Sequence, residues 1–210
     1  PIGTRWVDIN KGDKVNPEYR SRLVAKEIKM NKREDLSAAT PPLEAKKLLF
    51  SLAVAEGVGY EEGKRQHGMK LDFIDVRRAY FYARAKRDMY IKLPKEDEEA
   101  GMCGKLDMSM YGTRDAPQNW EFEYTDFMTG IGFSRGKATP CAFYHVARNI
   151  RAVVHGDDFT VLGYAKELDW FRGKILESFE VKFKARLGPR DTDAVSYTHL
   201  RAHETSLHLV

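Results

Sequence analysis

Three aspartates have the residue type and the spacing that metal chemistry requires. Asp75 lies near the end of the apolar segment 69–76, and Asp157 and Asp158 are adjacent between two further apolar segments. Carboxylates held close together repel one another unless a cation lies between them, and hard divalent cations such as Mg²⁺ favour oxygen ligands of this kind. Two such ions can activate an attacking hydroxyl and stabilise a leaving pyrophosphate. The three aspartates therefore predict a two-metal site for nucleotidyl transfer.

The adjacent aspartates also have simpler interpretations. Gly156, Asp157 and Asp158 form a natural turn sequence, and a polar hairpin turn needs no metal. An unrelated two-metal nuclease could also use three aspartates. The apolar segments around the pair, and the matching segment that leads to Asp75, favour the transfer site over a plain turn.

The elements that would position these carboxylates are strands and turns. Met69–Val76 has apolar residues on both parities, which predicts a strand with Asp75 at its C-terminal end. Val153–Leu162 predicts a hairpin whose turn carries the adjacent aspartates. The other expected elements are helices at 40–57, 116–130 and 165–179, a hairpin at 142–154, strands at 89–93 and 180–186, and extended structure with turns at 1–33. This mixed order of helices and antiparallel strands predicts an α+β fold.

The composition is that of a folded domain. Of the 210 residues, 42% are hydrophobic and 31% are charged, which is enough apolar material for a core. The longest apolar run, Leu48–Ala55, is too short to span a bilayer. The net charge of +4 is compatible with a polyanionic partner. Because the chain starts at Pro1 without an apolar leader and its two cysteines lie far apart, we expect no secretion, no disulfide framework and no cysteine zinc site.

Five blocks of sequence resemble one known family. Ile74–Tyr80 is similar to polymerase motif A of reverse transcriptases, and Met110–Trp120 resembles the Leu-Tyr-Gly-Leu-Lys-Gln-Ala-Pro-Arg-x-Trp block of copia-type retrotransposons. His155–Asp158 stands where that family has Tyr-Val-Asp-Asp. Arg20–Lys26 resembles its Lys-Ala-Arg-Leu-Val-Ala-Lys, and Met89–Pro94 resembles its Ile-Tyr-Met-x-x-Pro. The blocks follow the family's order over residues 4–190, so the chain is similar to a copia-type retrotransposon reverse transcriptase, a piece of the Pol polyprotein.

The resemblance implies a fold and a function. It implies a polymerase palm, an antiparallel sheet with helices on one face, together with fingers and without a thumb. Residues 1–70 would be mainly fingers and residues 71–190 the palm with an interleaved fingers segment. The implied activity is RNA-directed DNA polymerisation, in which dNTPs are added to a primer 3′-hydroxyl on an RNA or DNA template. The missing thumb and RNase H regions of the parent polyprotein are expected partners, no membrane is expected, and the implied locations are cytoplasmic virus-like particles and the nucleus.

The resemblance also assigns roles to individual residues. Two Mg²⁺ ions, for which Mn²⁺ can substitute, would be held by Asp75, the backbone carbonyl of Val76, Asp157 and Asp158. Tyr80 would be an aromatic steric gate that excludes a 2′-hydroxyl, although an ordinary core tyrosine is the alternative. The residues implied to bind the nucleotide are Arg22, Lys26, Val76, Tyr80, Tyr111, Gly112 and Arg114. A solvated basic strand is the alternative for Arg22 and Lys26.

Several positions depart from the family pattern. Asp115 would add a negative charge near phosphates, His155 would bind a primer phosphate or pack, and Gly156 would loosen the turn before Asp157. A catalytically inactive relic that folds and binds nucleic acid non-specifically is therefore the alternative function. A viral RNA-dependent RNA polymerase also uses Gly-Asp-Asp, but Tyr80 and the 111–120 block argue against it.

The C-terminal residues 191–210 are unlike the rest of the chain. His199 and His203 have the spacing of a helical zinc pair, but the string around them resembles a translated sequencing adapter. We therefore expect the tail to be disordered or an artefact and exclude 195–210 from the fold prediction.

Overall fold

The computed structural model describes residues 1–28 and 38–188, so the histidine-containing tail lies outside the described residues. The chain forms two units. The first consists of Pro1–Ala38 and Arg78–Tyr124, and the second of Ala39–Arg77 and Thr125–Val210. Both contain helices and antiparallel sheets, which confirms the α+β prediction. The assignment of fingers and palm stays a prediction.

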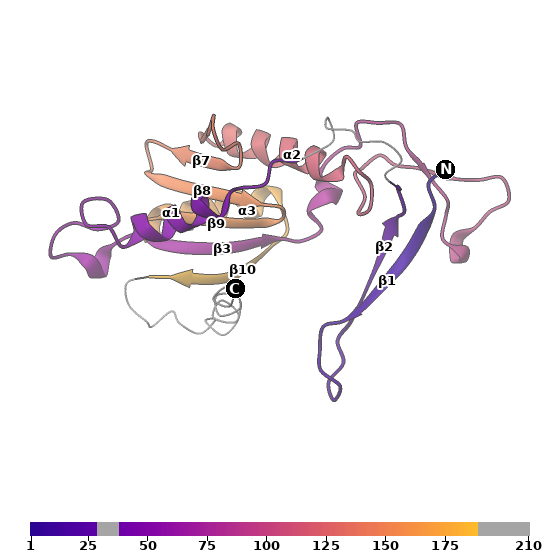
Figure 1. Ribbon diagram of the computed structural model, residues 1–210, viewed down its shortest axis with the longest axis horizontal. Helices are drawn as coiled ribbons and strands as arrows, with labels where there is room; N and C mark the ends of the chain where they lie inside the picture. The colour runs from indigo at the N-terminus through magenta and orange to yellow at the C-terminus, as the bar shows by residue number, and fades with distance from the viewer. Residues whose placement is uncertain (29–37, 189–210) are drawn as a thin grey trace. The chain divides into compact units, whose positions relative to one another are not determined.

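The second unit is built on a six-stranded antiparallel sheet (Figure 1). Its strands are β3 (Lys70–Val76), β6 (Ser134–Arg135), β7 (Ala142–His145), β8 (Ile150–His155), β9 (Asp158–Gly163) and β10 (Val181–Leu187). Their order in the sheet is β10-β3-β9-β8-β7-β6. Antiparallel neighbours can be joined by tight turns, and β8 and β9 are joined in this way at the adjacent aspartates. The predicted strands at 69–76 and 180–186 and both predicted hairpins are present, with ends shifted by up to three residues.

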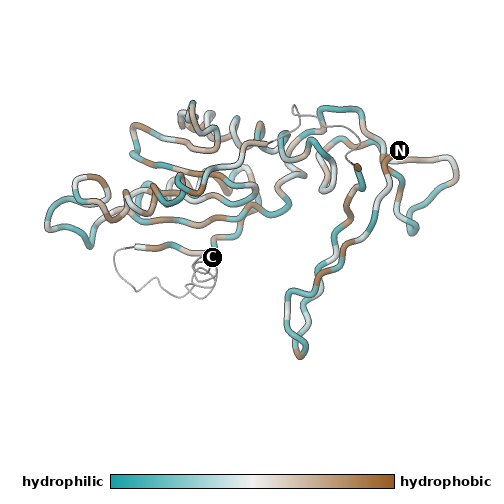
Figure 2. Tube along the Cα trace, viewed as in Figure 1, coloured by the Kyte–Doolittle hydropathy of each residue, from teal (hydrophilic) through white to brown (hydrophobic). Residues whose placement is uncertain are grey.

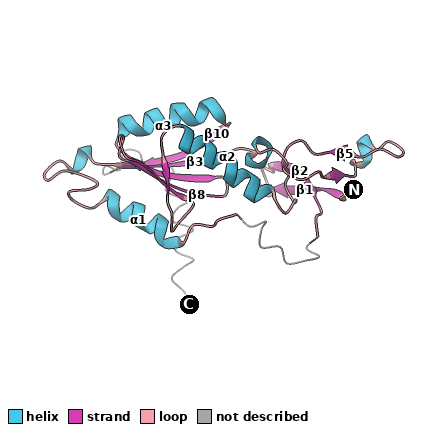
Figure 3. Cartoon of the chain, turned by 90° about the horizontal axis from the view of Figure 1, so that it is seen from above, coloured by secondary structure: helices cyan, strands magenta, loops and turns pink. Residues whose placement is uncertain are grey.

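Helices cover both faces of this sheet (Figure 3). On one face, Leu49 of α1 (Leu43–Ala53) packs with Leu71 of β3. On the other face, Arg172 of α3 (Ala165–Ser178) pairs with Asp72 of β3. The prediction of helices on one face was therefore wrong. The reason is that β3 carries apolar residues on both parities, so neither of its faces can be left to water.

The helix α2 (Ala116–Gly130) has the bounds that the sequence predicts. It starts in the first unit, where Trp120 is fully buried, and ends in the second, where Met128 is fully buried. In the second unit the ring of Phe127 lies 5.1 Å from that of Phe179 and 6.3 Å from that of Phe171 on α3. The helical spacing of aromatic residues therefore marks the core-facing side, as expected.

The first unit holds two short sheets. The hairpin of β1 (Thr4–Asn10) and β2 (Tyr19–Ala25) carries both hydrophilic and hydrophobic residues along its strands (Figure 2). Directly opposed residues share a face, so the pairs Val7–Arg22 and Ile9–Arg20 place two arginines on the same side. The second sheet pairs β4 (Tyr90–Ile91) with β5 (Gly104–Lys105). Short 3₁₀ helices are η3 (Ala79–Tyr82) and η4 (Lys95–Asp97) here and η2 (Arg65–His67) in the second unit.

Candidate functional site

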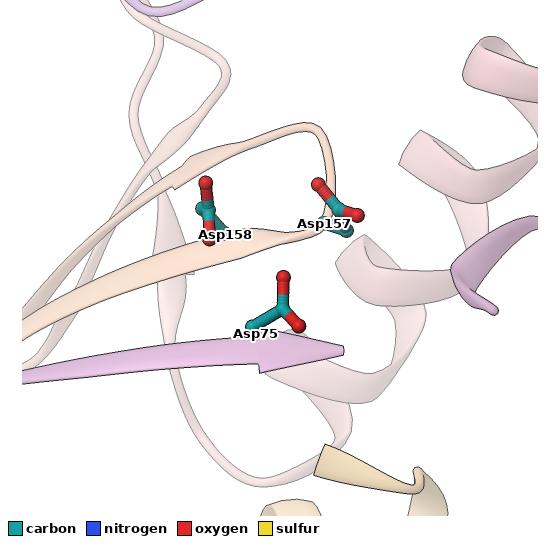
Figure 4. A group of neighbouring side chains, drawn as sticks. All are labelled: Asp75, Asp157 and Asp158. Atoms are coloured by element: carbon teal, nitrogen blue, oxygen red, sulfur yellow. The ribbon is translucent and has the colours of Figure 1, made fainter. Parts of the chain in front are cut away.

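The three predicted aspartates converge at one end of the six-stranded sheet (Figure 4). Asp75, one residue before the end of β3, lies opposite its cross-strand partner Asp158, the first residue of β9. Asp157 lies in the turn between β8 and β9. One oxygen of each carboxylate lies within 4.8 Å of one oxygen of the other two. The arrangement is one that a hard divalent cation could bridge, as the sequence predicts.

The turn before Asp158 is held in place at two points. His155 and Asp158 are paired across the hairpin, which leaves a two-residue loop, and His155 itself is exposed. Gly156 has a φ of +62°, a conformation that favours glycine and that a type II′ turn needs at its first central position. The backbone N–H of Val76 donates to the carbonyl of Asp157 at 2.9 Å. Gly156 therefore supplies the turn geometry, and β3 anchors the residue that follows it.

The charges around the carboxylates are unbalanced. Lys184 on β10 places its ammonium nitrogen 2.6 Å from an oxygen of Asp158 and 3.3 Å from one of Asp75. Burial lowers the pKa of Lys184, but the hydrogen bond to Asp158 and the two carboxylate charges outweigh it, so the pKa lies above its usual value. Burial, followed by the charges of Asp158 and Asp75, raises the pKa of Asp157, and a backbone hydrogen bond and the charge of Lys184 oppose this only in part. One lysine thus does not balance three carboxylates, and a bound cation would relieve the remaining repulsion.

A second charge cluster fixes the strand that carries Asp75. The fully buried Asp72 accepts hydrogen bonds from Arg172 at 2.7 and 2.9 Å and from Arg186 at 2.6 and 2.8 Å. Arg186 also donates to Asp169 at 2.7 Å. The hydrogen bond to Asp72 raises the pKa of Arg186 despite burial, so the guanidinium stays charged. The cluster joins β3, β10 and α3 on the face opposite the candidate site.

In the first unit, three of the predicted nucleotide-binding residues come together. The guanidinium of Arg22 lies over the ring of Tyr111, 5.1 Å from its centre, which is a cation–π distance. The rings of Tyr80 and Tyr111 have centres 4.6 Å apart, and Phe81 contacts Tyr111 edge-on at 5.6 Å. Residues 22, 80 and 111 therefore form one aromatic and cationic cluster, although they are far apart in sequence.

The loop after Tyr111 is fixed against the end of β2. The backbone N–H of Ala25 donates to the carbonyl of Tyr111 at 2.8 Å. Gly112 has a φ of +89°, and a Cβ there would overlap the carbonyl of Ala25, so only glycine fits. The carboxylate of Glu27 accepts the backbone N–H of Arg114 at 2.7 Å. Lys26 lies in this paired segment, and its side chain is exposed. The loop that contains Gly112 and Arg114 is thus tied to the segment predicted to bind the triphosphate.

Asp115 is paired rather than open to a phosphate. Its side chain is 2% exposed, and Arg87 donates to its two oxygens at 2.9 and 3.1 Å. Burial alone would raise the pKa of Asp115, but Arg87 outweighs it and the pKa lies below its usual value. A guanidinium nitrogen of Arg87 also lies 3.0 Å from a carboxylate oxygen of Glu27. The negative charge that the sequence led us to expect near phosphates is therefore neutralised inside the unit.

Comparison with known proteins identifies the family. Residues 1–189 match the family described as Reverse transcriptase (RNA-dependent DNA polymerase). The chain belongs to the reverse transcriptase family. It is 26% identical over 201 residues to the Retrovirus-related Pol polyprotein from transposon TNT 1-94 of Nicotiana tabacum, a match that covers 90% of this chain and 14% of that protein. It is 27% identical over 141 residues to the Retrovirus-related Pol polyprotein from transposon RE1 of Arabidopsis thaliana, covering 63% of this chain and 9% of that protein.

These matches confirm the resemblance to retrotransposon reverse transcriptases of the copia type. The reverse transcriptase chain spans 14% or less of the length of these relatives. Within residues 1–28 and 38–188, none of its helices has both the length and the apolar character needed to cross a membrane.

Sequence reasoning missed three residues that contact or position the candidate site residues of this reverse transcriptase chain. Lys184 contacts the carboxylates, Arg87 neutralises Asp115, and Asp72 anchors the strand of Asp75. A signal existed for Asp72, since an aspartate within an apolar strand needs a partner, but nothing in the sequence names that partner. Lys184 and Arg87 give no such signal, because each is one of 35 basic residues.

Proposed function

We propose that this reverse transcriptase chain carries the carboxylate site and nucleotide-binding residues of an RNA-directed DNA polymerase. The reaction joins the α-phosphate of a dNTP to a primer 3′-hydroxyl on an RNA or DNA template and releases pyrophosphate. The observation that carries the proposal is the approach of Asp75, Asp157 and Asp158 to within 4.8 Å in a chain of this family. Copying in cytoplasmic particles or the nucleus stays a prediction from the family.

The carboxylates suit divalent metal in number and chemistry. Asp75 and Asp157 would hold the ions, Asp158 would lie beside them, and the carbonyl of Val76 would add an oxygen ligand. Two Mg²⁺ or Mn²⁺ ions bound there would make the primer 3′-hydroxyl more nucleophilic and would stabilise the negative charge of the leaving pyrophosphate. The pKa of Asp157 is raised first by burial and then by the charges of Asp158 and Asp75, and a bound cation would offset these two charges.

The cluster in the first unit suits a nucleotide. Arg22 and Lys26 are exposed cations that would bind the triphosphate. The ring of Tyr80 is supported by the ring of Tyr111, which gives it the rigidity that a steric gate against a 2′-hydroxyl needs. Gly112 and Arg114 would complete the pocket through the loop that Glu27 holds.

Primer extension tests this function. The 210-residue chain is mixed with a labelled DNA primer on an RNA template, dNTPs and either Mg²⁺ or Mn²⁺. Asp75→Asn and Asp157→Asn each remove one ligand charge, and we expect each to reduce incorporation by at least about 100-fold, since metal contributes several kcal/mol to such transition states. Asp126→Asn, at an exposed position on α2, is the matched control and should retain activity.

Other outcomes would point to the alternatives. Incorporation that is equal in wild type and in both active-site variants would refute the assignment. An inactive relic would show nucleic-acid binding that falls with salt and ignores metal, without incorporation. A preference for rNTPs over dNTPs would favour an RNA polymerase, whereas loss of dNTP preference in Tyr80→Ala would support the steric gate.

A further inference from the structure

Lys184 occupies a position among the carboxylates that the proposed polymerase reaction does not explain. Its ammonium nitrogen lies 2.6 Å from Asp158 and 3.3 Å from Asp75, so it bridges two of the three residues proposed to hold metal. Among the residues that the structure describes, Asp157 forms no ion pair of its own. The lysine side chain is 44% exposed, which leaves it free to swing away from the cluster.

A β-bulge aims Lys184 at the cluster. Phe183 opposes Ile74, but Ala185 opposes Phe73, so Lys184 is an extra residue without a partner in the β10–β3 ladder. Such a bulge redirects side chains and is common beside active sites.

Because of the bulge, Lys184 and Arg186 pair with carboxylates on opposite faces of the sheet. In a regular strand, residues 184 and 186 would lie on the same face. Here Lys184 reaches Asp158 on one face, whereas Arg186 reaches the buried Asp72 on the other. The neighbouring Lys182 opposes Asp75 in the ladder but forms no ion pair with any of the three carboxylates. The contact of Lys184 is therefore produced by a specific backbone feature rather than by a surplus of basic residues.

We propose that Lys184 is an internal counter-cation of the carboxylate site, which competes with divalent metal and must leave Asp158 and Asp75 before the metal is fully bound. This inference rests on the proposed function, because it concerns the same metal site. Two effects act in the same direction. The ammonium occupies carboxylate oxygens that a metal would need, and its positive charge repels a cation brought to within a few ångströms. The lysine would thus hold the site together without metal and weaken its affinity for free metal.

Binding of Mn²⁺ to the whole chain tests the inference without relying on activity. Titrations followed by electron paramagnetic resonance would compare wild type with Lys184→Met, which keeps an unbranched side chain and removes the charge. We expect Lys184→Met to bind Mn²⁺ about tenfold more tightly, a modest change because the lysine is partly exposed. Lys184→Arg keeps the charge and should bind like wild type. Lys182→Met makes the same change in net charge two residues away and should change affinity by less than about twofold.

The outcomes separate the two proposals. Tighter binding in Lys184→Met alone, accompanied by a lower melting temperature without Mn²⁺ that Mn²⁺ restores, supports the counter-cation. Equal or weaker binding in Lys184→Met, with wild-type binding still abolished by Asp157→Asn, overturns the counter-cation and leaves the metal site standing. Equal tightening by Lys182→Met would also overturn it, because net charge alone would then explain the effect. Absence of Mn²⁺ binding in wild type and Lys184→Met would overturn the metal site and the inference together.

Discussion

Replacing Asp72 by Asn tests whether the buried charge cluster holds the strand that carries Asp75. The substitution keeps the shape of the side chain and removes the charge that two guanidiniums share. Arg172 and Arg186 would then face each other across a buried amide that can accept hydrogen bonds through only one of its two polar atoms.

The size of the effect follows from burial. The carboxylate of Asp72 is 0% exposed, whereas the side chains of Arg172 and Arg186 are 28% and 16% exposed. Removing one partner from a buried ion pair typically costs about 3–5 kcal/mol. Arg172 remains partly exposed to solvent, and Arg186 still pairs with Asp169. We therefore expect a loss at the lower end of this range, about 3 kcal/mol. In a chain of this length, that loss lowers the melting temperature by about 6–12 °C.

Thermal and urea unfolding followed by circular dichroism would measure the change. The matched control is Asp169→Asn, which removes an acidic partner of the same Arg186 at a position that is 64% exposed. An exposed ion pair contributes less than about 1 kcal/mol, so this control should be nearly neutral. A loss in Asp72→Asn no greater than that in Asp169→Asn would refute the reasoning, since burial would then make no difference.

Three further predictions concern the first unit and the turns. Arg87→Gln should lower the free energy of unfolding, measured in urea, by about 2–4 kcal/mol. The reason is that it leaves the carboxylates of Asp115 and Glu27, which are 2% and 15% exposed, without their cationic partner. A loss below about 1 kcal/mol would contradict this. Because folding lowers the pKa of Asp115, the charged carboxylate stabilises the folded chain fully above about pH 4. This contribution is lost as the pH falls through the pKa of Asp115 in the folded state. The difference in free energy of unfolding between wild type and Arg87→Gln should therefore decrease below about pH 4. A difference that does not change with pH would argue against Asp115 as the partner of Arg87. Gly112→Ala should lower the melting temperature more than Gly57→Ala. Both glycines have positive φ, but only at Gly112 would a Cβ overlap backbone atoms, those of Ala25. Equal effects of the two substitutions would show that the overlap is relieved.

Local patterns in the sequence determined the elements and the reactive residues. The apolar residues on both parities before Asp75 predicted β3, and the aromatic spacing from Trp120 to Met128 predicted α2 with its observed bounds. The sequence predicts Asp157 and Asp158 at a hairpin turn, and the structure has Asp157 in that turn and Asp158 as the first residue of β9. These predictions succeed because side-chain periodicity and turn chemistry act over a few neighbouring residues. Motif order along the chain also sufficed for the family, which the match over residues 1–189 shows.

Tertiary structure alone decided which distant charges meet. Lys184 reaches Asp158 only because β10 pairs with β3 and bulges at that point, and a strand register between segments about a hundred residues apart leaves no periodic trace in either segment. The same holds for Arg87, which neutralises Asp115 across 28 residues of chain. Helices cover both faces of the sheet because both faces of β3 are apolar, and only the assembled sheet shows which helix lies on which face. Sequence thus supplied the carboxylates and their strands, whereas folding chose their counter-ions, because electrostatic partners are selected by distance in space rather than by separation along the chain.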